Sequence, residues 1–441
     1  MTSNAGASQT GDLDEEEEEE TSTVCYDKIA RAIGDLKKHS VVVSPPFINK
    51  AGFSFTPDIK GNQIIYSLKA ICGVSDRTAE YIIKNQPFNS FKDFKEKMRG
   101  VITTKKEMYS LIKAGAFDEF EPDRVELMRS TVKEFAGAKG SLNGQNLQSI
   151  LNLSSFPSNF NIYKRYIRFK KYVTNKNFFY KIDEATRKNK NPKKWFVLDK
   201  ISEDFFIKHF ISLAVENKHY SYSEEGRIII CDKDFGDLIK KACEPLLNWI
   251  KTDECLAMYN EEIFYNEWNK YCSGTISKWE MDSLCYYYHE HEMANVNFKK
   301  YLVSDFEELP EIPQVVSTYK RKGREMPIFA ISRIIGTVIS KDNTKRIVTL
   351  LTPTGVVDVK FNKDSYSHYN KQLSKINPDG SKTIIEKSYF ARGTKLSIVG
   401  YRRENQFVVK RYKDSIFPHT VQKILEIKGS DLVFNSERET V

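Results

Sequence analysis

The sequence reads Leu68-Lys-Ala-Ile-Cys-Gly-Val-Ser-Asp-Arg-Thr-Ala-Glu-Tyr-Ile-Ile83 in its first third, and this stretch predicts a helix, a tight turn and a second helix. Gly73 lies where the turn needs a backbone conformation that a residue with a Cβ resists. Ser75 or Asp76 can cap the second helix, and Ala79 is small enough for close helix packing. Such a turn presents backbone N–H groups at a helix N-terminus, which predicts a binding site for a phosphate, whatever the base sequence.

A second hairpin follows directly. Ser90 begins a capping-box pattern before a helix that runs to Met98, and the turn Gly100-Val-Ile-Thr-Thr-Lys-Lys-Glu107 leads into another helix that ends near Gly115. A plain helical bundle with capped turns is the alternative interpretation, but two hairpins in tandem on a basic chain favour phosphate binding. The residues predicted to contact duplex phosphates are Gly73, Val74, Ser75, Arg77, Lys84, Thr103, Thr104, Lys105 and Lys106.

Charge is distributed unevenly along the 441 residues. The net charge is +9, yet residues 1–20 hold eight acids and no Lys or Arg. Without these eight, 51 acidic residues stand against 68 basic ones, which is +17 for the remainder. A basic surplus of this size favours a polyanionic partner, nucleic acid first, although a Lys-rich proteome would also produce it. Residues 1–24 are expected to be a disordered acidic tail.

The residue types that bind metals are present without the spacing that a metal site needs. None of the seven Cys form a C-x-x-C pair. His289 and His291 lie two apart on an expected helix and so do not share a face. Asp232 and Asp234 follow an apolar run, a pattern that metal-dependent polymerases and nucleases use, but here they are expected to cap the next helix. We therefore predict no metal and no cofactor on this chain.

The last third changes character. From residue 325 to 415, Val, Ile and Thr alternate with polar residues, and five expected strands with a helical excursion after the third predict an OB-fold barrel. In such barrels aromatic side chains stack on bases and basic ones follow the phosphates of a single strand. The candidates are Tyr366, Tyr369, Arg392, Arg402, Arg403, Lys410 and Arg411.

The predicted class is therefore α+β and multidomain, with a helical helix-hairpin-helix domain, a mostly helical middle segment and a C-terminal OB-fold β-barrel. No apolar run is long enough to span a membrane and no signal peptide is visible, so a cytoplasmic protein without a membrane partner is expected. The expected parts are the tail 1–24, a segment 25–60, the hairpin domain 61–137, a linker 138–160, the aromatic- and Lys-rich segment 161–324, the barrel 325–415 and a C-terminal tail 416–441.

Several of these stretches resemble one family. The motifs Ile65-Tyr-Ser-Leu-Lys-Ala-Ile-Cys-Gly-Val74, Pro87-Phe-Asn-Ser-Phe-Lys-Asp-Phe94 and Leu111-Ile-Lys-Ala-Gly-Ala-Phe-Asp118 are similar to the alpha subunit of bacterial DNA polymerase III, a family C polymerase. The stretch 277–291, with its Trp-Glu and later His, is similar to the helix before that family's barrel. The chain departs from the family at Ser75, where a glycine is usual.

The resemblance implies tandem hairpins that hold duplex DNA and a barrel that holds the template strand. It also implies that residues 25–60 continue the fingers of a polymerase. The palm with its catalytic aspartates is not found, so we expect no catalytic residue here, and we expect Mg²⁺ at the palm of a separate polymerase chain. A sliding clamp is a further expected partner, for which Gln148-Ser-Ile-Leu-Asn-Leu153 is a weak motif.

Two other functions stay open at this point. The chain could be a free-standing DNA-binding accessory protein for repair or recombination, although such a module has no need for residues 25–60. It could also be a nuclease that uses Asp232 and Asp234, which alanine at both positions would test.

Overall fold

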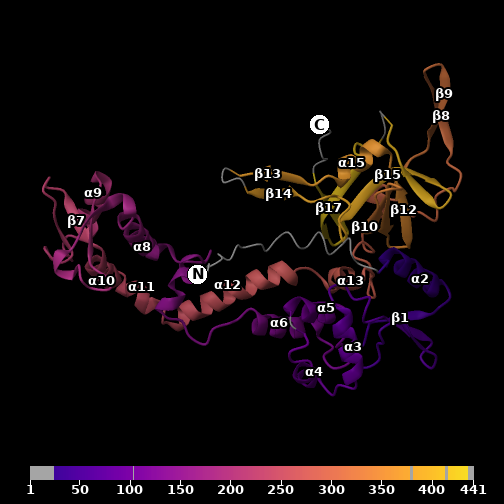
Figure 1. Ribbon diagram of the computed structural model, residues 1–441. Coiled ribbons are helices and arrows are strands. Elements are labelled where there is room, and N and C mark those ends of the chain that lie inside the picture. The colour runs from indigo at the N-terminus through magenta and orange to yellow at the C-terminus, as the bar shows by residue number, and fades with distance from the viewer. Residues whose placement is uncertain (1–23, 103, 378–380, 413–415, 436–441) are drawn as a thin grey trace, which may run out of the picture. The chain divides into compact units, whose positions relative to one another are not determined.

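The computed structural model describes residues 24–102, 104–377, 381–412 and 416–435 (Figure 1). Contacts divide them into two compact units. The first contains the described residues up to Met128 and from Cys272 onward, and the second contains Arg129–Tyr271. The α+β class predicted from the sequence is confirmed, because the first unit combines helical hairpins with a closed β-barrel.

Five strands close the barrel of the first unit. They are β10 (Ser332–Asp342), β11 (Ile347–Leu351), β12 (Val356–Lys360), β15 (Lys395–Arg403) and β16 (Gln406–Val409). Their order is β10-β11-β12-β16-β15, and β15 pairs again with β10. Only the β12–β16 pairing is parallel among these, and helix α15 (Lys363–Asn370) follows the third strand. This arrangement is that of an OB-fold, so the predicted barrel is confirmed.

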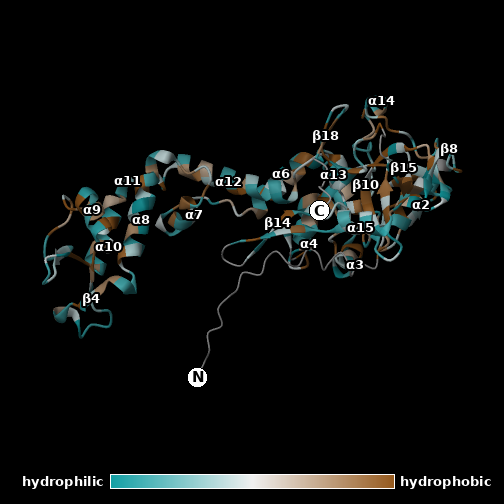
Figure 2. Ribbon diagram, turned by 90° about the horizontal axis from the view of Figure 1, so that it is seen from above, coloured by the Kyte–Doolittle hydropathy of each residue, from teal (hydrophilic) through white to brown (hydrophobic). Residues whose placement is uncertain are grey.

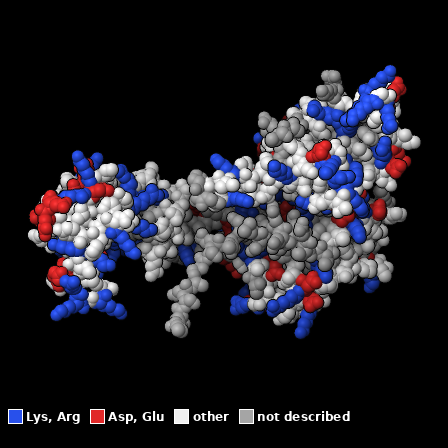
Figure 3. Space-filling view, turned by 45° about the horizontal axis from the view of Figure 1, so that its top comes forward, with Lys and Arg blue, Asp and Glu red and all other residues white. Residues whose placement is uncertain are grey.

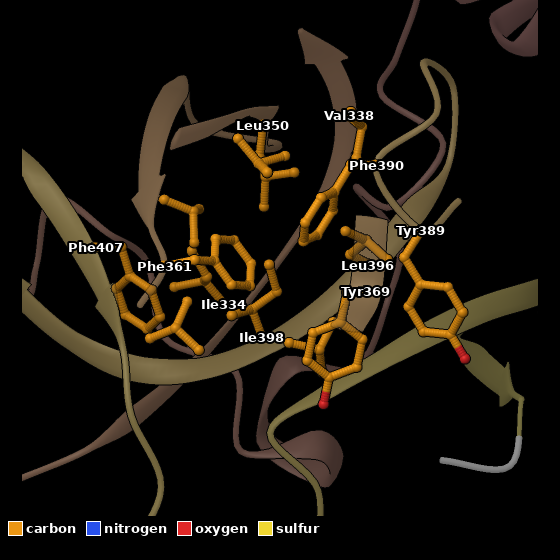
Figure 4. Close-up of a cluster of buried hydrophobic side chains, with 14 of the residues drawn as sticks. Ile334, Val338, Leu350, Phe361, Tyr369, Tyr389, Phe390, Leu396, Ile398 and Phe407 are labelled. Carbon is orange, nitrogen blue, oxygen red and sulfur yellow. The ribbon is translucent and has the colours of Figure 1, made fainter. Parts of the chain in front are cut away.

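The barrel closes around an apolar core (Figure 4). Alternate residues of β12, Val357 and Val359, point inward, as a period of two requires. Figure 2 shows hydrophobic residues concentrated in β10 and β15. Gly400 fits because a Cβ there would lie 2.1 Å from the carbonyl oxygen of Val408, on the neighbouring strand. The close approach of these two strands therefore requires glycine.

The barrel sheet extends beyond the predicted boundary. Residues 416–441 were expected to be a tail, but β17 (Val421–Lys428) and β18 (Asp431–Phe434) continue the sheet from β15. Val421 lies opposite Ile398 and is fully buried in the barrel core, which explains why this segment is ordered. The C-terminal boundary at residue 415 is therefore wrong.

Two hairpins leave the barrel in different directions (Figure 1). One consists of β8 (Val315–Arg321) and β9 (Arg324–Phe329), and the other of β13 (Leu373–Ile376) and β14 (Lys382–Glu386). Both are mostly exposed. The first one occupies the end of a segment that was expected to be mostly helical.

The N-terminal part of this unit packs on the barrel. Helix α2 (Tyr26–Lys38) inserts Ala30 into a cluster with Ile339 and Leu351 of the barrel. A small sheet follows, with the order β1-β3-β2. Its strands are β1 (Val42–Ser44), β2 (Thr56–Asp58) and β3 (Gln63–Ile65). Helix α13 (Ile276–Leu284) contributes Met281 to the same cluster. The short helix α14 (Phe298–Tyr301) precedes the β8–β9 hairpin.

The helical hairpins contain α3 (Asp76–Asn85), α4 (Phe91–Lys97), α5 (Lys105–Lys113) and α6 (Arg124–Phe135). The second predicted hairpin, α4-turn-α5, is present. The first lacks its first helix, because residues 68–73 form successive turns. Cys72 N–H donates to Ser283 O at 2.8 Å instead of to a helical carbonyl, so α13 replaces the missing intrahelical partner.

The second unit combines helices with a four-stranded antiparallel sheet in the order β4-β5-β7-β6. The prediction of a mostly helical segment therefore missed a sheet, although the hairpin near Tyr220 was expected. Phe206, Phe210 and Phe235 are buried between helices and one face of this sheet. The larger elements of this unit are α8 (Asn161–Val173), β4 (Phe179–Ile182), β5 (Lys194–Val197), α9 (Lys200–His209), β6 (Tyr220–Tyr222), β7 (Ile228–Cys231), α10 (Asp232–Ala242), α11 (Glu244–Trp249) and α12 (Asp253–Tyr271).

Residues 138–160 are not a linker. They fold into η1 (Gly144–Asn146), α7 (Leu147–Leu151) and η2 (Ser158–Phe160), and Ile150 packs in a cluster with Trp249. The Ser and Asn residues that suggested a linker act as caps, as Asn143 does for η1. Two further single turns are η3 (Lys176–Phe178) and η4 (Glu184–Thr186).

Candidate nucleic-acid interface

The two hairpin turns converge at the N-termini of α3 and α5. Each helix carries the predicted cap: the Ser75 hydroxyl accepts from Thr78 N–H at 3.2 Å, and the Thr104 hydroxyl accepts from Glu107 N–H at 3.3 Å. Glu107 joins the two helices, because its Oε1 accepts from Ser75 N–H at 3.2 Å and from the Thr78 hydroxyl at 2.8 Å. The two turns are therefore fixed to each other by hydrogen bonds to the buried Glu107 carboxylate.

The backbone at the first turn offers a specific set of donors. Gly73 has φ +82°, as the turn prediction required, and a Cβ there would lie 3.0 Å from Ser110 Oγ of α5. Ser75 N–H is taken by Glu107 and Val74 N–H by Ile71 O at 3.2 Å. The prediction that these two N–H groups bind phosphate is therefore contradicted. Within the described ranges, the N–H groups of Gly73, Asp76 and Arg77 have no protein acceptor.

The predicted cations of the hairpins have different positions. Arg77 lies in the first turn of α3 with an exposed side chain, and Lys105 and Lys106 begin α5, with Lys106 exposed. Lys84 lies in the last turn of α3, roughly 10 Å along the helix from Arg77 at 1.5 Å per residue. Lys84 cannot serve the same phosphate as the turn. Thr103 lies outside the described residues.

A buried charge cluster holds the hairpins against α13. The Arg124 side chain, 3% exposed, donates from Nη1 to Glu280 Oε1 at 3.1 Å and pairs with Asp118. Glu280, 1% exposed, also accepts from the backbone N–H of Tyr288 and His289 at 3.0 and 2.9 Å. The Trp-Glu and His that carried part of the family resemblance therefore have structural roles. Trp279 is likewise buried, and its Nε1 donates to Cys272 O at 2.9 Å.

Two barrel aromatics predicted to stack on bases cannot do so. Tyr366 and Tyr369 are each 5% exposed and belong to the barrel core. Figure 4 shows Tyr369 beside Tyr389, with ring centroids 5.6 Å apart. Helix α15 places both tyrosines inward, and the sequence alone does not show which face of this short helix meets the barrel. The prediction for these two residues is wrong.

Arg402 and Arg392 were predicted to contact DNA but are engaged in the protein. Arg402 is 7% exposed, and its Nη1 donates to the carbonyl oxygens of Phe306, Glu307 and Leu309, each at 3.1 Å. It fastens the segment that leads to β8. The Arg392 guanidinium lies 5.1 Å from the ring centroid of Tyr26, against α2. The prediction for Arg402 is contradicted, and Arg392 packs on Tyr26.

Three predicted barrel cations are exposed. Arg403 lies at the end of β15, and Lys410 and Arg411 follow β16. The turn between β15 and β16 is one of the loops by which OB-folds bind oligonucleotides. Arg411 also donates to Pro418 O at 2.6 Å, which orients its side chain.

The carboxylates of the nuclease hypothesis are bound by protein donors. Asp234 Oδ2 accepts from Lys193 Nζ at 2.6 Å, and Asp232 Oδ1 accepts from Lys194 N–H at 3.0 Å. Both lie in the first turn of α10, as the capping interpretation expected. In the part of the chain that the structure describes, no three His, Cys, Asp or Glu side chains are grouped as metal ligands. The nuclease alternative therefore lacks a site in these residues.

The weak clamp motif, residues 148–153, packs into the core of the second unit. Ile150 is fully buried and Leu151 is 8% exposed, so these apolar side chains of residues 148–153 are inaccessible to a partner. This string cannot be the clamp-binding motif while the unit is folded. No helix of the described residues is long and apolar enough to cross a membrane.

Tandem hairpin turns and a closed five-stranded barrel define a helix-hairpin-helix protein with an OB-type domain. A family model for the helix-hairpin-helix motif matches residues 40–127. The chain is related to DNA polymerases, DNA polymerase III alpha subunits among them, and the resemblance seen in the sequence is thereby confirmed.

The relatives differ in how much of the chain they cover. A probable DNA polymerase, YorL, of Bacillus subtilis strain 168 is 38% identical over 426 residues, which is 96% of this chain and 31% of that protein. The DNA-directed DNA polymerase of Bacillus phage SPbeta matches to the same extent. The DNA polymerase III subunit alpha of Thermus aquaticus is 34% identical over 108 residues, 24% of this chain and 9% of that protein. The chain thus spans under a third of the length of these relatives.

Proposed function

We propose that this chain is the DNA-holding portion of a family C-type DNA polymerase. Its helical hairpins would hold duplex DNA and its barrel would hold the template strand during replication. The observation that carries the proposal is the convergence of the two hairpin turns through Glu107 and Ser75, in a chain similar over 96% of its length to a DNA polymerase.

The turn supports duplex binding through its unpaired donors. Three backbone N–H groups, at Gly73, Asp76 and Arg77, find no acceptor among the described residues and lie at a helix N-terminus, where the helix dipole favours an anion. The exposed side chains of Arg77 and Lys106 add charge to the two turns. Contacts of this kind bind phosphates and do not read bases, which suits a protein that must move along any sequence.

The barrel supports single-strand binding through Arg403, Lys410 and Arg411. Since the predicted tyrosines are buried, binding here would be mainly electrostatic. Polymerisation itself is proposed to lie on another chain, which would supply the palm, its catalytic carboxylates and their Mg²⁺. A sliding clamp stays a proposed partner, and the cytoplasm the proposed location.

A pair of matched double variants tests the duplex site. Arg77→Ala/Lys106→Ala should weaken binding to duplexes of any sequence and lower the salt dependence of log Kd by about two. Lys60→Ala/Lys92→Ala removes the same charge from exposed positions outside the turns and should change Kd much less. Equal losses in both variants would contradict a site at the turns.

The split arrangement needs a separate test. The tagged chain is recovered from its native source after nuclease treatment, and bound proteins are identified by mass spectrometry. A co-purifying polymerase chain with a palm is the expected result. Recovery of no polymerase chain, with DNA binding retained, would instead indicate the accessory protein of repair or recombination.

A further inference from the structure

The β8–β9 hairpin is a narrow two-stranded ribbon with a basic end. Its strands pair from Val315↔Phe329 to Arg321↔Arg324, and the loop between them is only Lys322-Gly323. Lys322 has φ +49° and Gly323 φ +77°, as a type I′ turn requires. This tight turn places Arg321 and Arg324 directly opposite each other on one face.

The charge at this end is unbalanced. Residues 320–324 contain four cations (Lys320, Arg321, Lys322 and Arg324), and the one acid of the ribbon is Glu325, opposite Lys320. Among the ion pairs of the described residues, none involves these four cations. Like charges directly across a strand pair destabilise it. The arrangement therefore costs folding free energy that an anionic partner would recover.

The ribbon is fixed at its base and exposed along its length. Nearly every residue of β8 is exposed, and a two-stranded ribbon alone is marginally stable in water. The base is held by Phe329, whose N–H donates to Tyr412 Oη at 3.1 Å and whose ring lies 4.8 Å from that of Tyr401. Arg402 fastens the preceding segment through three carbonyl oxygens.

The anchoring places the ribbon beside the exposed barrel cations. Tyr401 precedes Arg403 by two residues, and Tyr412 directly follows Lys410 and Arg411. Figure 3 shows Lys and Arg side chains at the end of the protrusion that β8 and β9 form. The ribbon and the β15–β16 end of the barrel thus both carry more basic than acidic residues, with Glu325 in the ribbon and Glu404 in the β15–β16 turn as the acids.

We propose that the β8–β9 ribbon enters the major groove of duplex DNA, with the Arg321 and Arg324 face toward the bases. The major groove is about 12 Å wide and admits a two-stranded ribbon. Arginine donates hydrogen bonds to guanine N7 and O6 in this groove, so the proposed contact depends on these two acceptors. This contact is additional to the hairpin turns, and it rests on the proposed function because the polyanion is taken to be DNA.

The test compares two exposed ribbons of the same unit. Arg321→Gln/Arg324→Gln removes the two charges and also their mutual repulsion, so the thermal midpoint should stay equal or rise. Lys375→Gln/Lys382→Gln removes two charges from the β13–β14 hairpin and is the control. We expect the first variant to bind a blunt duplex roughly tenfold more weakly and to lower the salt dependence of log Kd by about two. The control should bind nearly as the unaltered chain does.

Methylation of guanine N7 with dimethyl sulfate probes the groove directly. Binding of the unaltered chain should be impaired by N7 methylation, and binding of Arg321→Gln/Arg324→Gln should not. An unchanged Kd and salt dependence for that variant, equal losses in the control, or indifference of the unaltered chain to N7 methylation would each overturn the ribbon's role. In those cases duplex binding that depends on Arg77 and Lys106 would leave the proposed function standing. Absence of any duplex binding by the unaltered chain would overturn both.

Discussion

Glu107 accepts the backbone N–H of Ser75 at 3.2 Å, so a carboxylate of one hairpin helix occupies part of the N-terminus of the other. Ser75 stands where the related polymerase family usually has glycine, and its hydroxyl caps α3. The same position therefore stabilises the helix and fastens the two turns, while a negative charge lies beside the proposed phosphate site. The Glu107 carboxylate therefore makes the two turns rigid and at the same time lowers the affinity of the site for an anion.

Replacing Glu107 by Gln should strengthen duplex binding. The amide oxygen can still accept from Ser75, whereas the negative charge at the helix N-terminus disappears. A charge at that position is worth about 0.3–1 kcal/mol, so Kd should fall roughly two- to fivefold. Fluorescence anisotropy with a labelled duplex measures it, and Glu80→Gln, on the exposed face of α3, is the control. Weaker binding of Glu107→Gln would mean that the phosphate does not lie at this turn.

Replacing Arg124 by Met should destabilise the first unit strongly. Glu280, 1% exposed, would lose its buried counter-charge, and breaking such a pair costs about 3–5 kcal/mol. Arg124→Met/Glu280→Gln should lose less than Arg124→Met alone, because the unpaired charge is removed too. Denaturant unfolding measures both, and Lys300→Met, in an exposed pair with Asp431, should leave the midpoint unchanged. A double variant less stable than Arg124→Met would contradict this account.

The sequence predicted those elements whose signals are local. Caps and glycines showed the hairpin turns, since Ser75, Thr104 and Gly73 each act within a few residues. The alternation of Val, Ile and Thr with polar residues predicted the barrel strands. The orientation of α15 depends on contacts distant in sequence, so Tyr366 and Tyr369 were assigned to the surface although they are buried.

Other errors have the same cause. Arg402 was predicted to be a surface cation because its three carbonyl partners lie over 90 residues away along the chain. The occupation of Ser75 N–H by Glu107 needs the two hairpins in contact, which spacing does not show. The β8–β9 ribbon was missed because its strands bury no apolar face and thus lack the alternating pattern.

Stability should fall in mild acid through His291. Burial, together with the positive charge of Lys395, lowers the pKa of His291 to about 4, although the hydrogen bond to Leu351 O opposes this shift. Its Nδ1 accepts from Met293 N–H at 3.0 Å and its Nε2 donates to Leu351 O at 3.1 Å, so the folded protein holds the neutral ring. The unfolded chain binds a proton below about pH 6.5 while the folded chain does not. The contribution of neutral His291 to the free energy of unfolding is therefore fully present above pH 6.5. It is lost progressively toward pH 4, by up to about 3 kcal/mol.

Denaturant unfolding between pH 4 and 7 measures the contribution of His291. His291→Gln should lose stability at pH 7 but show a smaller decline with acid than the unaltered chain. His39→Gln, at an exposed position, should leave the decline unchanged. An identical decline in His291→Gln would assign the acid sensitivity to other groups.

The Cys72 thiol should react more slowly once Cys285 is removed. The two Sγ atoms lie 3.5 Å apart, and a hydrogen bond from Cys285 lowers the pKa of Cys72, with the charge of Arg392 acting in the same direction. Since the thiolate is the nucleophile, Cys285→Ala should raise the pKa of Cys72 and slow its alkylation by iodoacetamide at pH 7. Mass spectrometry of the alkylated peptide follows Cys72 alone, and Cys243→Ala, in the other unit, is the control. Faster alkylation in Cys285→Ala would show that Cys285 shields Cys72 rather than activating it.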